Sequence, residues 1–345
     1  INAALKISMK KDSKLLCYGL GVTDPKAIFG TCKDLERIFG KKRVFDVPCS
    51  ENALTGISIG SALGGVRSVV THQRLDFFLL AMDQLVNSAA KWNYMFGGQT
   101  PVPITIRLIV GRGWGQGPTH SQNLHSWFAH IPGLKVVMPT FPEDAKNLLI
   151  KSIFDPNPVL FIEHRWLHNL EGSVNFRKTT KIKEQSKIIK KGKDITIISM
   201  SYLTNEAIKA TKILKKHFGI EAEIIDLRYI KPLDLNTIIR SVRKTKRAIV
   251  LDTGVEICSI ASEICTNISM KLFDHLKSPP IRMAMPDIPE PTSYALTKNF
   301  HINYETIVNR IIKIFNIKKN SSKVLKLYRS KLHHDQPHKE FLGPF

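Results

Sequence analysis

The sequence predicts an α/β fold with two domains, each built on a parallel sheet. The chain has 345 residues and is 43% hydrophobic, enough for two packed cores. Short apolar runs alternate with helical patterns along most of its length, which is typical of mainly parallel sheets. One polar, basic stretch at 170–193 breaks this alternation and predicts a linker between the domains.

The first domain is expected to cover residues 1–169. Helical patterns at 50–65 and 78–96 separate some of its apolar runs, which favours parallel pairing of the strands. The predicted strands are 15–20, 43–48, 66–71, 103–110, 134–139 and 158–164.

The second domain is expected at 194–317 and repeats the alternation. Its predicted strands are 194–201, 221–228, 247–253 and 279–286, and its predicted helices are 204–217, 234–243 and 257–272. The tail, 318–345, is basic and has no clear periodic core pattern. We therefore expect it to be disordered or docked on a partner.

Composition narrows the class of protein. No apolar run reaches the ~18–20 residues that a membrane helix needs, so no membrane partner is expected. The first residues, INAALKISMKKDSK, do not resemble a secretory signal, and the start at Ile1 rather than Met suggests that a few residues are missing or were removed. Five cysteines without paired spacing indicate a reduced, intracellular protein and argue against a zinc site.

The net charge of +22 leaves a nucleic-acid-binding protein as one alternative. Its lysines, however, are scattered through helical stretches instead of being grouped with aromatic residues. A general lysine bias explains this pattern better, and we expect no nucleic-acid partner.

Glu51 is the first residue that could carry chemistry. It follows Ser50, a residue type that often caps helices, and a carboxylate in a first helical turn also suits the helix dipole. That structural role is sufficient by itself. The alternative is a ligand-binding carboxylate at the carboxyl edge of the first sheet.

The stretch 111–130, GRGWGQGPTHSQNLHSWFAH, is rich in glycine, tryptophan and histidine and follows a predicted strand. Histidines five residues apart would not share one helical face, so a metal site is disfavoured. His120 remains a candidate for acid–base work or anion contact. In the helical pattern before this strand, one aromatic of the pair Phe77 and Phe78 could stack on a ligand ring rather than fill the core.

Several long motifs, in order, resemble one family over residues 1–317. The chain is similar to the beta subunit of thiamine diphosphate-dependent 2-oxo acid dehydrogenases of the pyruvate or branched-chain type, within the transketolase-like superfamily. The motifs are SENALTGISIGSALGG, AMDQLVNSAAKWNYMFGGQ, PVPITIR, THSQNLHSWFAHIPGLKVVMP, EDAKNLLIKSIFDPNPV, AEIIDLRYIKPLD and MPDIPEPTS. The resemblance implies a pyrimidine-binding domain followed by a transketolase C-terminal domain.

The resemblance also implies roles for particular residues. Glu51 would contact the aminopyrimidine ring of the cofactor, Phe77 would stack on that ring, and His120 would lie near the substrate. A carboxyl bonded to a ring nitrogen favours the imino tautomer that activates the cofactor. A potassium site, built largely from backbone carbonyls, would fall on Ile104, Ser152, Ile153, Asp155 and Asn157. The sequence DPNP at 155–158 is in any case expected to form a turn.

The resemblance implies that this chain acts only with a partner. The superfamily binds the diphosphate and Mg²⁺ through a Gly-Asp-Gly motif, which this sequence lacks. An alpha subunit would supply that half of the site, and two beta chains would associate in an α2β2 heterotetramer. A lipoyl acyltransferase would accept the acyl group. The expected location is a bacterial cytoplasm or an organellar matrix.

The chain departs from the family at its expected substrate pocket. Leu80 replaces a frequent glutamine, Leu20 and Gly21 replace an acidic pair, and Arg112 and Trp114 enlarge a loop that is usually smaller. Arg112 could meet an anionic substrate or be a solvated loop residue. These differences keep open a two-chain transketolase-like or acyloin-forming carboligase of carbohydrate metabolism. A catalytically silent subunit is disfavoured, because Glu51, Phe77 and His120 are present.

Overall fold

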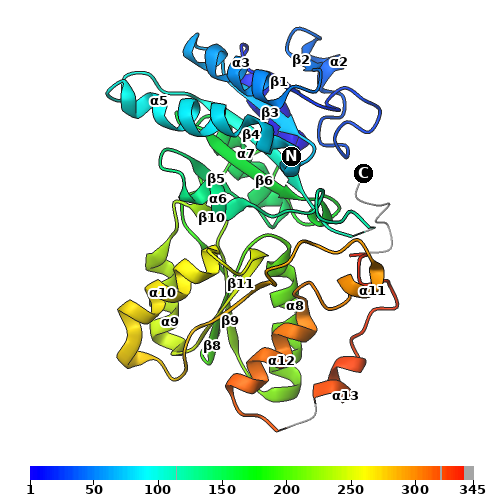
Figure 1. Ribbon diagram of the computed structural model, residues 1–345, viewed down its shortest axis with the longest axis vertical. Coiled ribbons are helices and arrows are strands. Elements are labelled where there is room, and N and C mark those ends of the chain that lie inside the picture. The colour runs from blue at the N-terminus through cyan, green and yellow to red at the C-terminus, as the bar shows by residue number, and fades with distance from the viewer. Residues whose placement is uncertain (114, 319–320, 338–345) are drawn as a thin grey trace.

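Two α/β units lie one above the other in this computed structural model, which describes residues 1–113, 115–318 and 321–337 (Figure 1). The N-terminal part forms the upper unit in the figure and the C-terminal part the lower one. Each unit contains one sheet, and all but one strand of each sheet pair in parallel. The predicted fold class is therefore confirmed.

The first sheet has seven strands in the order β10-β5-β6-β4-β3-β1-β2. Six of them are the strands expected from the sequence, and they pair in parallel. Their bounds are β1 Leu16–Gly19, β2 Val44–Asp46, β3 Ser68–His72, β4 Ile104–Val110, β5 Lys135–Val137 and β6 Val159–His164.

Helices cover both faces of the first sheet, which explains why its central strands are apolar on both sides. Along β4, Ile104, Ile106 and Leu108 pack in one core together with α3 (Glu51–Leu63) and the helical segment that follows β3. Ile109 faces the opposite core, which α1 (Asn2–Lys11) and α7 (Pro142–Ile153) complete. The segment after β3 consists of α4 (Leu75–Phe78), η1 (Leu79–Ala81), η2 (Gln84–Ala89) and α5 (Ala90–Met95).

The second sheet has five strands in the order β12-β11-β8-β9-β7. Its helices lie on two faces: α8 and α12 pack together in one core, and α9 and α10 pack in the other. The bounds are β7 Lys187–Lys190, β8 Ile195–Ser199, α8 Tyr202–Phe218, β9 Ala222–Asp226, α9 Leu235–Thr245, β11 Ala248–Val255, α10 Ile260–Leu272, β12 Ile281–Met285 and α12 Tyr304–Ile314.

Two strands depart from the sequence-based expectation. Strand β7 lies inside the predicted linker 170–193 and pairs antiparallel with β9 at the sheet edge. Strand β10 (Tyr229–Lys231) follows β9 in the chain but pairs antiparallel with β5 of the first sheet. Neither strand has a long apolar run: β7 is an edge strand that is largely exposed, and β10 has only three residues, of which Tyr229 and Ile230 are buried. The crossing by β10 ties the two units together.

The described part of the tail also differs from what was expected. Its helix α13 (Ser321–Lys326) buries Val324 and Leu325 in the core of the second unit. Farther along, Arg329 forms an ion pair with Glu305 at 3.0 Å, and Asp335 lies against Gly113. Residues 321–337 therefore pack on this chain itself. In these described residues, Val324 and Leu325 contact the core of the second unit where disorder or docking on a partner was expected, and docking of the tail on a partner stays a prediction.

Within the described residues, each helix is too short or too polar to cross a bilayer.

Candidate active site

Three of the predicted site residues lie at one edge of the first sheet. Glu51 follows β2, Phe77 follows β3, and His120 lies in the loop after β4. These strands are parallel, so their carboxyl ends meet at the same edge, which is where α/β folds bind ligands. The connections after the three strands therefore place an acid, an aromatic ring and an imidazole on the same side of the molecule.

Glu51 is the first residue of α3, as predicted, and is only 7% exposed. Ser50 occupies the N-cap position, but its side chain makes no capping hydrogen bond. Within the described part of the chain, the Glu51 carboxylate has no hydrogen-bond or ion-pair partner either. Glu51 is a buried residue, yet its carboxylate oxygens are not among the buried atoms that lack a partner, so they remain accessible to a ligand.

Phe77 and His120 are in direct contact. Their ring centroids are 5.3 Å apart in an edge-to-face arrangement. The Thr119 hydroxyl lies 3.0 Å from His120 Nδ1, which leaves Nε2 available for another group. Phe77 remains 37% exposed, so part of its ring can receive a flat ligand.

Two residues that the sequence analysis missed hold the His120 loop in place. The Arg74 guanidinium donates to the His120 carbonyl at 3.3 Å. Asp76 Oδ1 accepts hydrogen bonds from the Gln122 backbone N–H and side-chain amide, at 3.1 and 3.0 Å. Burial raises the pKa of Asp76 despite these bonds. Their signal in the sequence was a pair of charges, QRLD, directly after a buried strand.

The substrate-pocket candidates do not form one cluster. Leu80 is 69% exposed on η1, so its side chain is not enclosed by this chain. Arg112 is 6% exposed, which rules out a solvated loop arginine. Its guanidinium stacks over Trp166, 4.0 Å from the ring centroid, and over Tyr202, 5.1 Å from the ring centroid. Trp114 lies outside the described residues.

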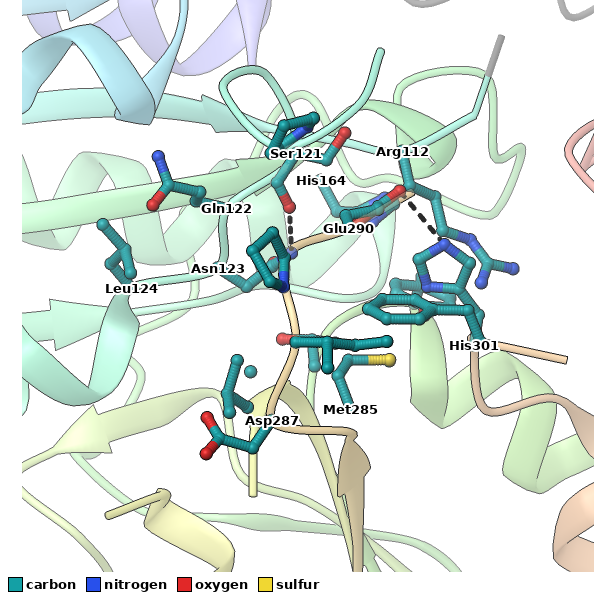
Figure 2. Close-up of a pocket in the computed structure, with 18 residues that line it drawn as sticks. Arg112, Ser121, Gln122, Asn123, Leu124, His164, Met285, Asp287, Glu290 and His301 are labelled. Carbon is teal, nitrogen blue, oxygen red and sulfur yellow. Dashed lines mark hydrogen bonds and ion pairs between the residues drawn. The ribbon is translucent and has the colours of Figure 1, made fainter. Parts of the chain in front are cut away.

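Arg112 lines a cavity between the two units, with a volume of about 320 Å³ (Figure 2). The loop after β4, the ends of β6, β11 and β12, and the start of α8 form its walls. Glu290 and His301 lie in this cavity with the Glu290 carboxyl 3.1 Å from His301 Nε2. Burial raises the pKa of Glu290 to about 8 and lowers those of His301 and His164. Sequence reasoning missed these three residues, since they are far apart along the chain.

The residues expected to bind potassium lie at the opposite edge of the first sheet. Ile104 begins β4, Ser152 and Ile153 end α7, and the predicted turn at 155–158 leads into β6. The Asp155 carboxylate is already engaged: Lys135 Nζ lies 2.6 Å from Oδ2, and the Asn157 N–H donates to Oδ1 at 2.9 Å. A cation here would therefore have to use backbone carbonyl oxygens, as the family resemblance implies.

Two transketolase domains match most of the chain. The transketolase pyrimidine-binding domain matches residues 1–169, and the transketolase C-terminal domain matches residues 184–307. The fold and the edge site thus define a protein of the transketolase class. A solved structure described as a split gene transketolase, inactive beta4 tetramer, superposes with a TM-score of 0.74 over 92% of this chain and 97% of that chain. At 17% identity, it supports the fold alone.

More similar relatives identify the family. The beta subunit of mitochondrial pyruvate dehydrogenase E1 from Pisum sativum is 37% identical over 316 residues, covering 89% of this chain and 87% of the relative. The beta subunit of acetoin:2,6-dichlorophenolindophenol oxidoreductase from Bacillus subtilis is 36% identical over 321 residues, covering 90% and 94%. The chain belongs to this family of thiamine diphosphate-dependent dehydrogenase beta subunits, as the sequence motifs predicted.

Proposed function

We propose that this chain is the beta subunit of a two-chain thiamine diphosphate-dependent 2-oxo acid dehydrogenase. It supplies the aminopyrimidine half of an active site shared with an alpha subunit, for oxidative decarboxylation and acyl transfer to lipoyl. The observation that supports this proposal best is the position of the Glu51 carboxylate, which has no partner among the described residues, at the same sheet edge as Phe77 and His120. A ring nitrogen of the cofactor would give this carboxyl the hydrogen-bond partner that it lacks.

Each of the three residues has a separate task in this proposal. Bound thiamine diphosphate supplies a carbon nucleophile and an electron sink for decarboxylation. Glu51 holds the ring nitrogen and thereby fixes the tautomer of the aminopyrimidine. Phe77 packs its exposed ring against the pyrimidine, and His120 directs Nε2 toward the substrate, because Nδ1 faces Thr119.

The diphosphate half of the site would come from the alpha subunit. This chain has no Gly-Asp-Gly motif for Mg²⁺ and the diphosphate. Exposed apolar residues lie on α3, on η1 and at the end of α5, in the helical layer that covers one face of the first sheet. These residues, which partner chains would cover in an α2β2 assembly, are Ile57, Leu80, Tyr94, Met95 and Phe96.

We also propose a structural K⁺ on the backbone carbonyls around the turn at 155–158, at the edge of the sheet opposite Glu51. Its role would be to stabilise the turn between α7 and β6. The cellular location is proposed to be a bacterial cytoplasm or an organellar matrix.

The decisive experiment combines this chain with the alpha-like subunit from the same source, thiamine diphosphate and Mg²⁺. Carbon dioxide release is followed for a panel of 2-oxo acids, and a lipoyl domain is then added as the acceptor. We expect release only from the pair, and a loss of about 100-fold or more with Glu51→Gln. Glu171→Gln, on an exposed residue outside the site, is the matched control.

Other outcomes of this experiment would change the assignment. Decarboxylation without acylation of the lipoyl domain, but with carbon–carbon bond formation when an aldehyde is added, would favour a carboligase. Full activity of the Glu51→Gln pair would refute the role of Glu51. A complex that binds cofactor but releases no carbon dioxide from any 2-oxo acid would refute the dehydrogenase and point to a hydroxyketone or ketose donor.

A further inference from the structure

The cavity between the two units is not part of the edge site described above. The residues that line it in the described part of the chain do not include Glu51, Phe77 or His120. It does share a wall with that site, because Ser121 and Gln122 line the cavity directly after His120. Its volume of about 320 Å³ is within the range of small-molecule pockets. Carboxyl ends of strands from both sheets face this space, the usual position of ligands in α/β folds.

Arg112 is the charged group that a ligand would meet. Its Nε and Nη1 atoms are buried and have no hydrogen-bond partner, and none of the ion pairs among the described residues includes it. The two carboxyl groups near Arg112 interact with other residues. Glu290 is paired with His301, and Asp335 is close to Thr297 and His334. A buried guanidinium with two unpartnered donors is costly unless an anion enters.

Aromatic residues hold the guanidinium in one orientation. Trp166 and Tyr202 stack against it, and the Trp166 indole N–H also donates to the Arg112 carbonyl at 3.2 Å. A guanidinium fixed in this way loses little entropy when it binds an anion. Its planar fork of N–H donors matches the two oxygens of a carboxylate.

The other titratable groups inside the cavity leave Arg112 as its main charge near neutral pH. The raised pKa of Glu290, about 8, keeps that carboxyl largely protonated, and burial holds His164 and His301 in their neutral forms. Asp287 is exposed to solvent. One fixed positive charge balances a monoanion better than a phosphate dianion.

Part of the remaining wall is apolar, beside polar residues such as Ser121 and Thr253. The apolar part provides a surface for a short carbon chain next to the guanidinium, and Figure 2 shows Leu124 and Met285 in it. The apolar side chains are Leu124, Val255, Met285, Ile288 and Phe300. A ligand that suits this lining has one anionic end and a small hydrocarbon body.

We propose that the cavity between the units is a binding site for a small organic monocarboxylate. The carboxylate would receive N–H donors from Arg112, and the hydrocarbon part would pack against Leu124 and Met285. Glu290 and His301 would complete the site as neutral hydrogen-bonding groups.

The test uses the full chain without an alpha subunit, by isothermal titration calorimetry at pH 7. The probes are pyruvate and isobutyrate, with the neutral analogue isobutyramide and inorganic phosphate for comparison. We expect one saturable site for a carboxylate, and binding at least about tenfold weaker with Arg112→Met. Isobutyramide and phosphate should bind more weakly than the carboxylates. Arg329→Met, on an exposed arginine paired with Glu305, is the matched control and should bind normally.

A second variant tests the cavity independently, in case Arg112→Met fails to fold. Leu124→Trp fills the apolar side of the cavity and leaves the guanidinium in place, so it should also weaken carboxylate binding. Glu51→Gln should leave this binding unchanged even though it abolishes the proposed catalysis, which separates the two sites. Equal affinity in the wild type and in both cavity variants would overturn the proposal. The proposal would also be overturned if neither pyruvate nor isobutyrate bound at concentrations up to ~50 mM, an upper limit for a very weak site. Binding of phosphate that is tighter than binding of the carboxylates would overturn it as well.

Discussion

Asp76 shows how a single side chain can position a loop that carries a candidate catalytic group. Its Oδ1 atom receives two hydrogen bonds from Gln122, two residues beyond His120. Asp76 directly precedes Phe77 in the chain. Its hydrogen bonds to Gln122 therefore hold the loop that carries His120 next to the segment that carries Phe77. The contact between the rings of Phe77 and His120 depends on this anchor and on the Arg74 bond to the His120 carbonyl.

We therefore predict that Asp76→Ala lowers kcat/KM of the assembled enzyme by about tenfold or more, because two hydrogen bonds that fix the loop are lost. Asp76→Asn keeps an acceptor oxygen at the same place and should restore most of the activity. Steady-state decarboxylation by the three proteins checks this prediction. Equal losses in Ala and Asn variants would mean that the charge, rather than the anchoring, matters.

The raised pKa of Glu290 should make the free energy of unfolding depend on pH. Burial raises its pKa to about 8, with Asp335 and Asp76 acting in the same direction and Arg112 and Ser121 opposing it. The folded chain then holds a proton that the unfolded chain has already released above its ordinary pKa of 4.5. The contribution of this carboxyl group to the free energy of unfolding is therefore fully present below its ordinary pKa and is lost as the pH rises toward 8.

We expect Glu290→Gln to remove this dependence. Between pH 6.5 and 8 the wild-type free energy of unfolding should fall by about 1–2 kcal/mol relative to the variant. The neighbouring His301 has a lowered pKa, so it is neutral in both states through most of this window. Urea unfolding at several pH values measures the difference, with the exposed Glu256→Gln as control. Parallel curves for the wild type and Glu290→Gln would contradict the prediction.

At the scale of elements, neighbouring strands of the first sheet share a buried ion pair. Arg107 on β4 and Glu163 on β6 are both almost fully buried, with Nε–Oε1 and Nη2–Oε2 distances of 2.5 and 2.9 Å. Each charge is tolerated because the other is present, and the Thr31 hydroxyl also accepts from Arg107 at 2.9 Å. The Arg107 guanidinium helps to hold the pKa of Glu163 near 2 against the effect of burial.

We predict that Glu163→Gln destabilises the chain by about 3–5 kcal/mol, because a buried guanidinium loses its counter-ion. The double variant Arg107→Met, Glu163→Leu should lose less than this, since no charge remains buried. Equilibrium unfolding in urea gives both values. The control is Arg37→Gln, on an exposed pair with Asp34, which should change stability by less than about 1 kcal/mol. A double variant less stable than Glu163→Gln would refute the argument.

At the scale of the whole molecule, the two units are joined by more than the connecting chain. Strand β10 leaves the second unit to extend the first sheet, and its Lys231 donates to the carbonyls of Ala129 and Ile131 at 2.8 and 2.7 Å. A buried His125–Asp252 pair, 2.9 Å apart, also crosses from one unit to the other. These contacts fix the walls of the cavity that contains Arg112.

The packed tail gives a prediction at this scale. Leu325→Ala should lower the free energy of unfolding by about 2–5 kcal/mol, because Leu325 is buried in the core of the second unit. Leu327→Ala, two residues further on and exposed, is the matched control and should change it by less than about 0.5 kcal/mol. Thermal unfolding of the isolated chain measures both. Equal stability of the two variants would show that the tail does not contribute to this core.

The sequence by itself determined the local elements and the family. Apolar runs and helical periodicity predicted the ten main strands, and ordered motifs indicated Glu51, Phe77 and His120 as candidate site residues, because these signals lie within short stretches of chain. Only the tertiary structure decided the pairing of β10 with β5, the packing of the tail and the burial of Arg112. These features depend on contacts between residues far apart in sequence, for which no local periodicity exists. The cavity is the clearest case, since Arg112, His164, Glu290 and His301 meet only when the two units pack together.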